Sequence, residues 1–151
     1  MHRVLFVCTG NTCRSPMAEA ILRSKKLSGV EVRSAGVFAA NGAAASLNSI
    51  LVMDENKIGH SHQSRLLEKE DIDWATVILA MTMTHKQAIT GRFPEALGKT
   101  YTLKEFAGEK GYPDVGDPFG GDIHVYRDTF SELQGLIEKA SKKLMEQEYR
   151  E

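Results

Sequence analysis

The sequence lacks any apolar run near the roughly 20 residues that a membrane-spanning helix requires. It also lacks the features of a secretory signal peptide, because the apolar stretch from Met1 to Val7 is short and a polar, glycine-containing stretch follows it. There is no large excess of one charge either. The formal net charge is -1, so a general affinity for nucleic acid or for an acidic membrane surface is not expected. We therefore expect a cytoplasmic protein with neither a membrane nor a nucleic acid as its partner.

Cysteine is scarce, and repeats are absent. The two cysteines, Cys8 and Cys13, are too few and too close in sequence for a disulfide framework, which leaves catalysis, redox chemistry or a role in the core. No internal repeat, low-complexity tract or linker rich in proline and serine divides the chain. A single domain over residues 1–151 is the simplest interpretation, and this length is sufficient to bury a hydrophobic core.

Four short apolar segments alternate with helical patterns along the chain. Strands are predicted at residues 3–7, 30–34, 75–81 and 99–103, and helices from residue 16 onward and at 43–57, 84–90 and 123–148, with a helical turn at 68–73. This alternation predicts a three-layer α/β fold, in which a four-stranded parallel sheet carries helices on both faces. Ligands of such sheets bind at the carboxyl ends of the strands, so chemistry is expected in the loop after the first strand.

The apolar spacing also predicts which side chains the helices bury. The helix at 43–57 is expected to present one inward face, made of Leu47, Ile50, Leu51 and the nearby Ile58. The final helix is expected to bury Phe130, Leu133, Ile137 and Leu144. Trp74 is expected in the core. His60 and His62 have no third metal ligand nearby, so a solvated loop is expected there rather than a metal site.

The loop from Cys8 to Ser15, with the sequence Cys-Thr-Gly-Asn-Thr-Cys-Arg-Ser, is suited to binding an anion. Gly10 and Asn11 tolerate unusual backbone angles, so the loop can curl until several backbone N–H groups point at one centre. The start of the following helix adds partial positive charge at the same place. Arg14 can hold two phosphate oxygens at once. The pattern therefore predicts a phosphate site. It is not the nucleotide-binding type, because the motif with lysine is missing.

Cys8 lies where the field of this loop acts most strongly. A thiol near a helix N-terminus and an arginine is stabilised as the thiolate, the nucleophilic form. The sulfur would then lie below the phosphorus, in line for attack, and the Ser15 hydroxyl can donate a hydrogen bond to it. A lone cysteine would be explained as a small buried hydrophobe at a strand end. The spacing of Cys8 and Arg14, with five residues between them at a strand–helix junction, favours catalysis.

The segment Val7 to Glu19, VCTGNTCRSPMAE, closely resembles the signature of the low-molecular-weight protein tyrosine phosphatase family. Three further segments fall where that family has comparable motifs: Arg33 to Gly36, Ala80 to Thr82 and Asp117 to Gly121. The resemblance covers the whole chain and implies a four-stranded parallel sheet flanked by helices. It also implies a two-step reaction through a phosphocysteine intermediate, without a metal or a cofactor.

By the same resemblance, Cys8 is the nucleophile and Arg14 binds the phosphate, within a cradle formed by Thr9, Gly10, Asn11, Thr12, Cys13, Arg14 and Ser15. The resemblance makes Asp117 the general acid of the first step and the base of the second. Chemistry supports that role, since the leaving atom must be protonated and a loop carboxylate can reach it. Asp114 is the nearest competitor and Asp122 the next. Cys8 and Cys13 form a candidate redox pair, although Cys13 could simply pack under the loop.

The substrate is decided by a few positions around the cradle. Family members that act on phosphotyrosine commonly have isoleucine where this chain has Thr12, and often tyrosine where it has Phe119. The chain resembles the bacterial protein-arginine phosphatase branch in Thr12, in residues 33–39 and in residues 117–121. A phosphoarginine side chain is thin, planar and polar, which suits a threonine. We expect an enzyme acting on phosphoarginine in proteins, with phosphotyrosine as the alternative.

Two other classes of function remain open alternatives. Thioredoxin-coupled arsenate reductases share the fold and the first loop, but they need further cysteines, and residues 81–85 contain none. A non-catalytic phosphate-binding module is expected to have lost Cys8 or Asp117, and both are present. Release of free phosphate from a phosphopeptide would distinguish an enzyme from such a module.

Overall fold

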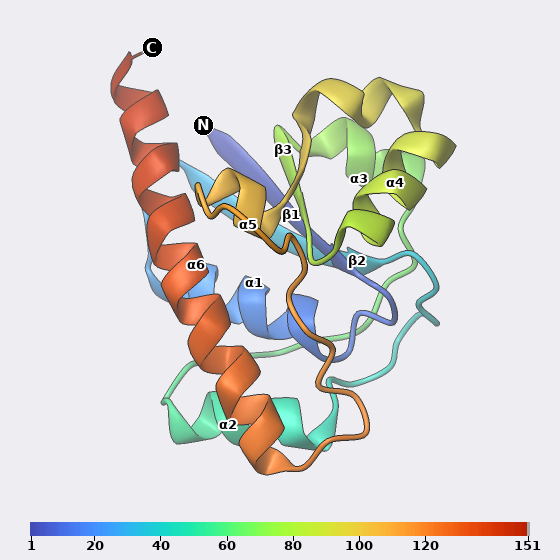
Figure 1. The fold of residues 1–151 in the computed structure, drawn as a ribbon, viewed down its shortest axis with the longest axis vertical. Coiled ribbons are helices and arrows are strands. Elements are labelled where there is room, and N and C mark those ends of the chain that lie inside the picture. The colour runs from blue at the N-terminus through green and yellow to red at the C-terminus, as the bar shows by residue number, and fades with distance from the viewer. Residues whose placement is uncertain (151) are drawn as a thin grey trace.

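The computed structural model describes residues 1–150, with side chains described through residue 147 (Figure 1). The strands are β1 (His2–Cys8), β2 (Val30–Gly36), β3 (Val77–Ala80) and β4 (Thr100–Thr102). The helices are α1 (Arg14–Ser24), α2 (Leu47–Glu55), α3 (Lys69–Trp74), α4 (Met83–Arg92), α5 (Leu103–Phe106) and α6 (Ile123–Arg150), with a 3-10 helix η1 (Pro94–Lys99).

The strands form one four-stranded sheet in the order β2-β1-β3-β4, and every pairing is parallel. β1 lies between β2 and β3, and its residue Val7 is in register with Ala35 on one side and with Ala80 on the other. The carboxyl ends of these three strands therefore meet at one edge of the sheet. The predicted parallel α/β sheet is confirmed, and the loop after β1 begins at this edge.

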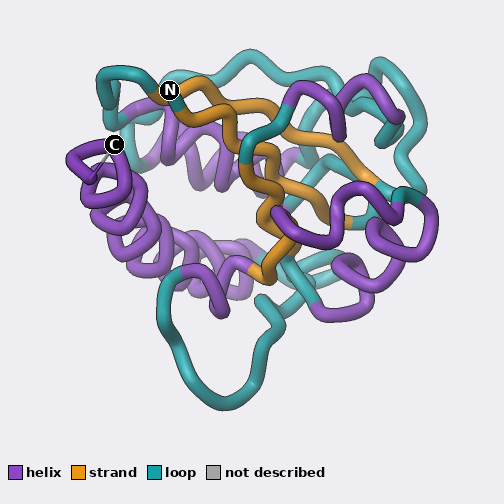
Figure 2. Tube along the Cα trace, turned by 90° about the horizontal axis from the view of Figure 1, so that it is seen from above, coloured by secondary structure: helices purple, strands orange, loops and turns teal. Residues whose placement is uncertain are grey.

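Helices cover both faces of the sheet (Figures 1 and 2). Alternate side chains of β1 enter the two cores: Val4, Phe6 and Cys8 join the first cluster, whereas Leu5 and Val7 join the second. The first core is completed by α1, α2, α5 and α6, and the second by α3, α4 and η1. Because a strand turns successive residues to opposite faces, Cys8 is placed on the side of the sheet that carries α1.

The inward face predicted for the helix at 43–57 is correct for Ile50 and Ile58, which pack against the core, and wrong for Leu47 and Leu51. α2 begins at Leu47, because the Ser46 side chain accepts a hydrogen bond from the backbone N–H of Ser49 and caps the helix. Leu47 and Leu51 are 71% and 43% exposed, whereas Val52 and Met53 are fully buried. The segment carries more apolar residues than this short helix can bury, so periodicity alone could not identify the buried face.

The segment from residue 94 to 106 also differs from the prediction. Residues 99–103 were expected to form one strand, but β4 is only three residues long, with η1 before it and α5 after it. Thr102 and Glu105 form a capping box at the start of α5, which turns the chain out of the sheet. The third strand is likewise shorter than predicted, at Val77–Ala80, and α4 extends to both sides of the predicted 84–90.

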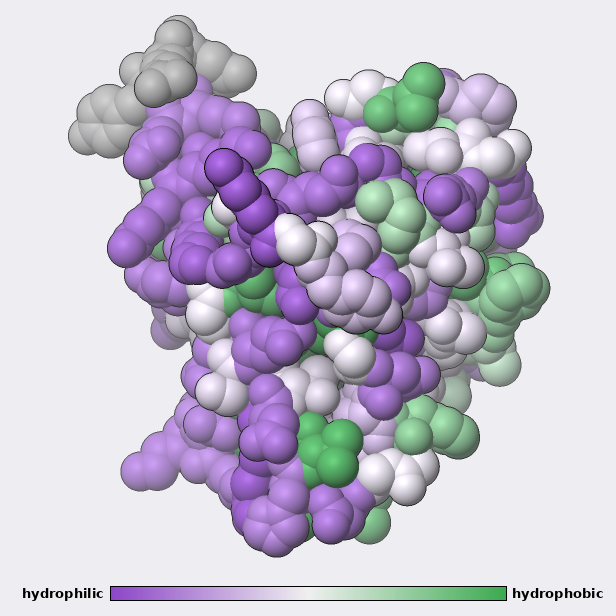
Figure 3. All heavy atoms as spheres, in the orientation of Figure 1, coloured by the Kyte–Doolittle hydropathy of each residue, from purple (hydrophilic) through white to green (hydrophobic). Residues whose placement is uncertain are grey.

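The long final helix is confirmed, and its predicted inward residues Phe130, Leu133, Ile137 and Leu144 are all buried. Its outward face is largely hydrophilic (Figure 3). Among the helices of the described residues, none is both long and apolar enough to cross a membrane.

Gly36, at the end of β2, determines how closely the first loop approaches the sheet. A Cβ atom at this position would lie 2.4 Å from the Thr9 carbonyl oxygen and 2.9 Å from the Asn11 backbone nitrogen. Both of these atoms belong to the backbone of the loop, so no side-chain rotation can relieve the overlap.

We predict that Gly36→Ala lowers the free energy of unfolding by at least about 1–3 kcal/mol, the usual cost of overpacking, and displaces the loop. Gly135→Ala is the matched control, because Gly135 lies in α6 with open space around it. That substitution should stabilise the protein by up to about 1 kcal/mol through helix propensity. Chemical denaturation of both variants measures the difference, and equal stabilities would contradict the proposed close packing.

Candidate active site

Asn11 holds the loop between β1 and α1 in its curled form. Its φ is 58°, in the left-handed region that asparagine tolerates. The fully buried side chain donates from Nδ2 to the hydroxyls of Ser15 (2.8 Å) and Ser34 (2.9 Å), and its Oδ1 accepts from the backbone N–H of Arg65 (2.9 Å). One amide group thus ties the loop to α1, to β2 and to the segment before α3.

Cys8 lies at the bottom of this loop, with its sulfur 2.8 Å from the Ser15 hydroxyl oxygen. Because the Ser15 oxygen already accepts a hydrogen bond from the Asn11 amide, its own O–H is available to donate to the sulfur. A hydrogen bond donated to sulfur stabilises a thiolate over a neutral thiol. The N-terminal end of α1 at Arg14 adds positive charge from the helix dipole.

The Arg14 guanidinium is buried, and it lines the same cavity as Cys8. One terminal nitrogen donates to the Val115 carbonyl oxygen at 2.9 Å, and the other lies 3.6 Å from Asp117 Oδ2. The buried Nε has no hydrogen-bond partner among the described residues. A buried N–H of a charged group is costly to leave unpaired, and the guanidinium of Arg14, which lines the adjacent cavity, is suited to binding an anion there.

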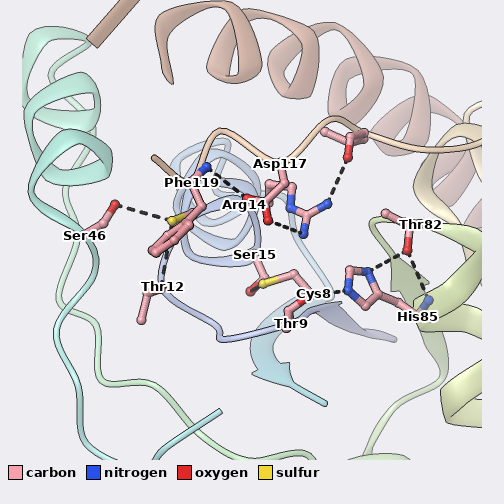
Figure 4. Close-up of polar contacts among 12 residues, drawn as sticks. Cys8, Thr9, Thr12, Arg14, Ser15, Ser46, Thr82, His85, Asp117 and Phe119 are labelled. Carbon is pink, nitrogen blue, oxygen red and sulfur yellow. Dashed lines mark hydrogen bonds and ion pairs between the residues drawn. The ribbon is translucent and has the colours of Figure 1, made fainter. Parts of the chain in front are cut away.

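That cavity has a volume of about 260 Å³, and Figure 4 shows several of the side chains around it. It is lined by Cys8, Thr9, Gly10, Thr12, Cys13, Arg14, Asp117 and Phe119. The sequence had placed every one of these residues at the phosphate cradle or its mouth. The two other predicted members, Asn11 and Ser15, lie behind the loop and support it.

The three competing aspartates of the loop before α6 have different surroundings. Asp114 accepts a hydrogen bond from the backbone N–H of Met83 (2.7 Å), and Asp122 accepts from those of His124 and Val125 at the start of α6. Both cap helices. Asp117 alone of the three lines the cavity, and its half-exposed side chain can reach a bound ligand.

The loop that carries Asp117 is fastened over the cradle. The Val115 backbone N–H donates to the Met81 carbonyl oxygen at 2.8 Å, and the Val115 carbonyl accepts from Arg14. Figure 1 shows this segment crossing the region of α1 before it enters α6. Phe119, two residues beyond Asp117, is 78% exposed at the cavity mouth.

Cys13 is buried in the same loop, and neither it nor Cys8 is in a disulfide. Its sulfur lies 3.4 Å from the Tyr126 hydroxyl and 3.6 Å from the Ser46 hydroxyl. Burial, together with the hydrogen bond to Cys13, raises the pKa of Tyr126. Cys13 therefore packs between the loop, α2 and α6, while it also lines the cavity.

The prediction of a solvated loop at His60 and His62 is wrong for His62. Its side chain is only 7% exposed, and its Nε2 lies 2.6 Å from the Asn11 carbonyl oxygen. The segment folds back because Ser64 bonds to the backbone of residues 40 and 43, a long-range contact that no local pattern predicts. His62 thus supports the cradle.

Trp74, expected in the core, is only partly buried, and it stacks with the Arg33 guanidinium.

His85 was not among the predicted site residues. It is 6% exposed, and it joins α4 to the cradle through a hydrogen bond between its Nε2 and the Thr9 hydroxyl (2.8 Å). Burial, and then the positive charge of Arg14, lower the pKa of His85 from 6.5 to about 4. Its imidazole is therefore neutral at physiological pH. The only signal in the sequence was a histidine four residues after the end of the strand predicted at residues 75–81.

The comparisons with known proteins agree with this geometry. The family described as low molecular weight phosphotyrosine protein phosphatase matches residues 3–151, and the chain belongs to this family. It is 57% identical over 144 residues to a protein-arginine-phosphatase of Geobacillus stearothermophilus, covering 95% of this chain and 96% of the relative. A solved structure of the YwlE arginine phosphatase from that organism has a TM-score of 0.95 at 54% identity, covering 99% of this chain and 97% of that one.

Two further relatives bear on the chemistry. A YwlE arginine phosphatase mutant, solved with a phosphorylated active-site serine, has a TM-score of 0.90 at 42% identity and covers 95% of both chains. The low molecular weight protein-tyrosine-phosphatase PtpB of Staphylococcus haemolyticus is 41% identical, covering 91% of this chain and 96% of the relative. Relatives named for each of the two substrates are therefore found.

We predict that His85 makes the protein less stable in mild acid. The unfolded chain takes up a proton on this histidine near pH 6.5, whereas the folded chain does so only near pH 4. The free energy of unfolding should therefore fall as the pH is lowered through this window, by up to about 1.4 kcal/mol per pH unit. His85→Gln should reduce that slope. Urea denaturation between pH 7.5 and 5 measures it, and identical slopes in parent and variant would contradict the assignment.

Proposed function

We propose that this chain is a protein-arginine phosphatase that hydrolyses phosphoarginine through a phosphocysteine intermediate on Cys8. The observation that carries the proposal is one cavity that Cys8, Arg14 and Asp117 line together. A nucleophile, an anion-binding donor and a proton source are what hydrolysis of a phosphorylated side chain requires. The names of the two arginine phosphatase relatives support the choice of substrate.

In the first step, the Cys8 thiolate attacks the phosphorus of the bound phosphoryl group. A sulfur–phosphorus bond forms, the phosphorus–nitrogen bond breaks, and Asp117 in its acid form protonates the departing guanidine nitrogen. Arg14 and the N-terminal end of α1 stabilise the charge on the phosphoryl oxygens. The products of this step are a protein with a free arginine side chain and phosphocysteine on the enzyme.

In the second step, the Asp117 carboxylate accepts a proton from water, whose oxygen attacks the phosphorus. The sulfur–phosphorus bond breaks, inorganic phosphate leaves, and the electron pair returns to Cys8 as a thiolate. The Ser15 hydroxyl, 2.8 Å from the sulfur, stabilises that thiolate and makes it a better leaving group. The proposed reaction requires no metal or cofactor.

The threonine at position 12 favours phosphoarginine over phosphotyrosine as the substrate. It lines the cavity, and no large aliphatic side chain lines that cavity with it among the described residues. A threonine offers a phenyl ring less apolar area than isoleucine and tolerates a polar guanidinium. Phosphotyrosine remains the alternative, which the tyrosine phosphatase relative supports. Arsenate reduction is the distant alternative, and residues 81–85 contain no cysteine for its disulfide relay.

The proposal extends to the cellular setting. We propose a single-domain cytoplasmic enzyme whose partners are phosphorylated proteins, because a cysteine nucleophile is active only while its thiol is reduced. The relatives described above come from bacteria where an organism is given, which agrees with a bacterial enzyme.

The test of the function is turnover of two peptides of matched sequence, one with phosphoarginine and one with phosphotyrosine. Phosphate release is measured at neutral pH, because the phosphorus–nitrogen bond is labile in acid. The parent enzyme should show the higher kcat/KM for phosphoarginine, and Cys8→Ser should abolish turnover while phosphate binding remains. A preference for phosphotyrosine would overturn the substrate, and residual activity of Cys8→Ser within tenfold of the parent would overturn the nucleophile.

We predict that Asp117→Asn slows turnover by about 10²- to 10⁴-fold, the range for loss of a general acid–base group. Asp114→Asn is the matched control, because Asp114 caps α4 and does not line the cavity. It should lower thermal stability more than it lowers kcat. If Asp114→Asn were instead the crippling change and Asp117→Asn a mild one, the acid would be wrongly assigned.

We predict that Thr12→Ile raises kcat/KM for phosphotyrosine and lowers it for phosphoarginine. One side-chain change in a pocket typically shifts discrimination by about 10- to 200-fold. Both constants are measured for parent and variant on the matched peptides. An unchanged ratio in an enzyme that prefers phosphoarginine would leave the function intact and refute this explanation of its selectivity.

We also propose that Cys8 and Cys13 form a reversible disulfide under oxidation, which protects the Cys8 thiolate from irreversible oxidation. Both lie in one loop and line one cavity. Mild peroxide treatment followed by peptide mass spectrometry should find the disulfide, with activity restored by a reducing agent. Sulfinic or sulfonic Cys8 with Cys13 still reduced is the result that excludes the protective role.

A further inference from the structure

A chain of hydrogen bonds reaches the cavity from α4, outside the loop that forms the cradle. The Thr82 hydroxyl caps α4 by accepting the backbone N–H of His85 at 3.1 Å, and it lies 3.0 Å from His85 Nδ1. The other ring nitrogen, Nε2, lies 2.8 Å from the hydroxyl of Thr9, which lines the cavity. Figure 4 shows the three side chains in sequence, ending beside Cys8.

The contacts define the direction in which these hydrogen bonds run. The imidazole is neutral, so one ring nitrogen donates and the other accepts. The Thr82 oxygen already accepts a backbone N–H, and His85 Nδ1 is the acceptor that the described residues offer for its O–H. Thr82 therefore donates to Nδ1, which places the ring proton on Nε2, and Nε2–H donates to the Thr9 oxygen.

The opposite arrangement satisfies fewer groups. If Nδ1 carried the ring proton, the Thr82 oxygen would accept two N–H donors and its own proton would have no acceptor among the described residues. The Thr9 proton would then point at His85 instead of the cavity. In a half-buried site the arrangement that leaves no donor unpaired is favoured.

From this direction we infer that the Thr9 hydroxyl donates a hydrogen bond to an oxygen of the bound phosphoryl group, and that His85 is the positioning residue that orients it. Because the Thr9 oxygen accepts from Nε2–H, its proton is free to turn toward the cavity. The inference deepens the proposed function and rests on it only for the presence of a phosphoryl group in this cavity. It adds one side-chain donor to the donors of the backbone and Arg14.

The test uses inorganic phosphate as the probe. Its affinity is measured directly by calorimetry and also as the inhibition constant of phosphate as a competitive inhibitor. Thr9→Val keeps the side-chain shape and removes the hydroxyl, and it should weaken phosphate binding about tenfold, the size of one hydrogen bond to a charged group. Thr9→Ser should restore most of the affinity. Thr84→Val, at an exposed threonine of α4, is the control for loss of a hydroxyl and should bind phosphate like the parent.

The role of His85 is tested by a double-mutant cycle, which measures whether the effects of His85 and Thr9 on phosphate binding depend on each other. His85→Phe should weaken phosphate binding as much as Thr9→Val does, and the double variant should be no weaker than either single one. His85→Gln, whose amide N–H can replace Nε2–H, should bind more tightly than His85→Phe. Unchanged phosphate affinity in Thr9→Val would overturn the inference, even if His85→Phe failed to fold. If the double variant lost affinity by the sum of the two single losses, the role of His85 in orienting Thr9 would be overturned. A parent that binds phosphate but does not turn over phosphoarginine would contradict the proposed function alone.

Discussion

The site depends on the buried side-chain amide of Asn11. Its three hydrogen bonds join the loop to the first turn of α1, to β2 and to the segment before α3, and His62 holds the Asn11 carbonyl oxygen from the same segment. The loop and the start of α1 are thus joined to two parts of the chain that are distant in sequence, β2 and the segment before α3, around one residue in a left-handed conformation. A buried amide with unsatisfied groups is costly, so the loop is stable only when all these parts are in place. The cradle is consequently preorganised before any ligand enters.

This preorganisation also explains the electrostatics of the cavity. The fold buries Arg14 with an unpaired Nε, turns the helix dipole of α1 toward the same point and directs the Ser15 proton at the Cys8 sulfur. The unpaired Nε is costly on its own, and all three arrangements favour the negative charge of a thiolate and a phosphoryl group. Asp117 brings a carboxyl group to the same cavity, on a loop fastened by Val115. The surrounding sheet supplies the rigidity that holds these charges in position.

Much of this could be predicted from the sequence. The buried strand at residues 3–7, the anion-binding loop and the long helix with Phe130 and Leu133 inward follow from local spacing, and the structure places Cys8, Arg14 and Asp117 around one cavity. The errors at Leu47, His62 and His85 share one cause, which is contact between residues far apart in the chain, whereas the end of β4 is set by the local capping box of Thr102 and Glu105. Leu47 is exposed because the core face of α2 is set by its neighbours, and His62 is buried because its segment folds back on the loop. His85 is separated from Thr9 by 76 residues, so no local pattern could have joined them.

The central claim is that the Cys8 sulfur, held in this cradle, takes the phosphoryl group from phosphoarginine. The most direct measurement mixes the enzyme rapidly with a phosphoarginine peptide, stops the reaction in denaturant at neutral pH and locates any phosphoryl group by peptide mass spectrometry. The account predicts a phosphoryl group on Cys8 that appears within the first turnover and disappears as the peptide is consumed. Release of phosphate with no phosphoryl group on Cys8 at any time, or a phosphoryl group on another residue, would contradict it.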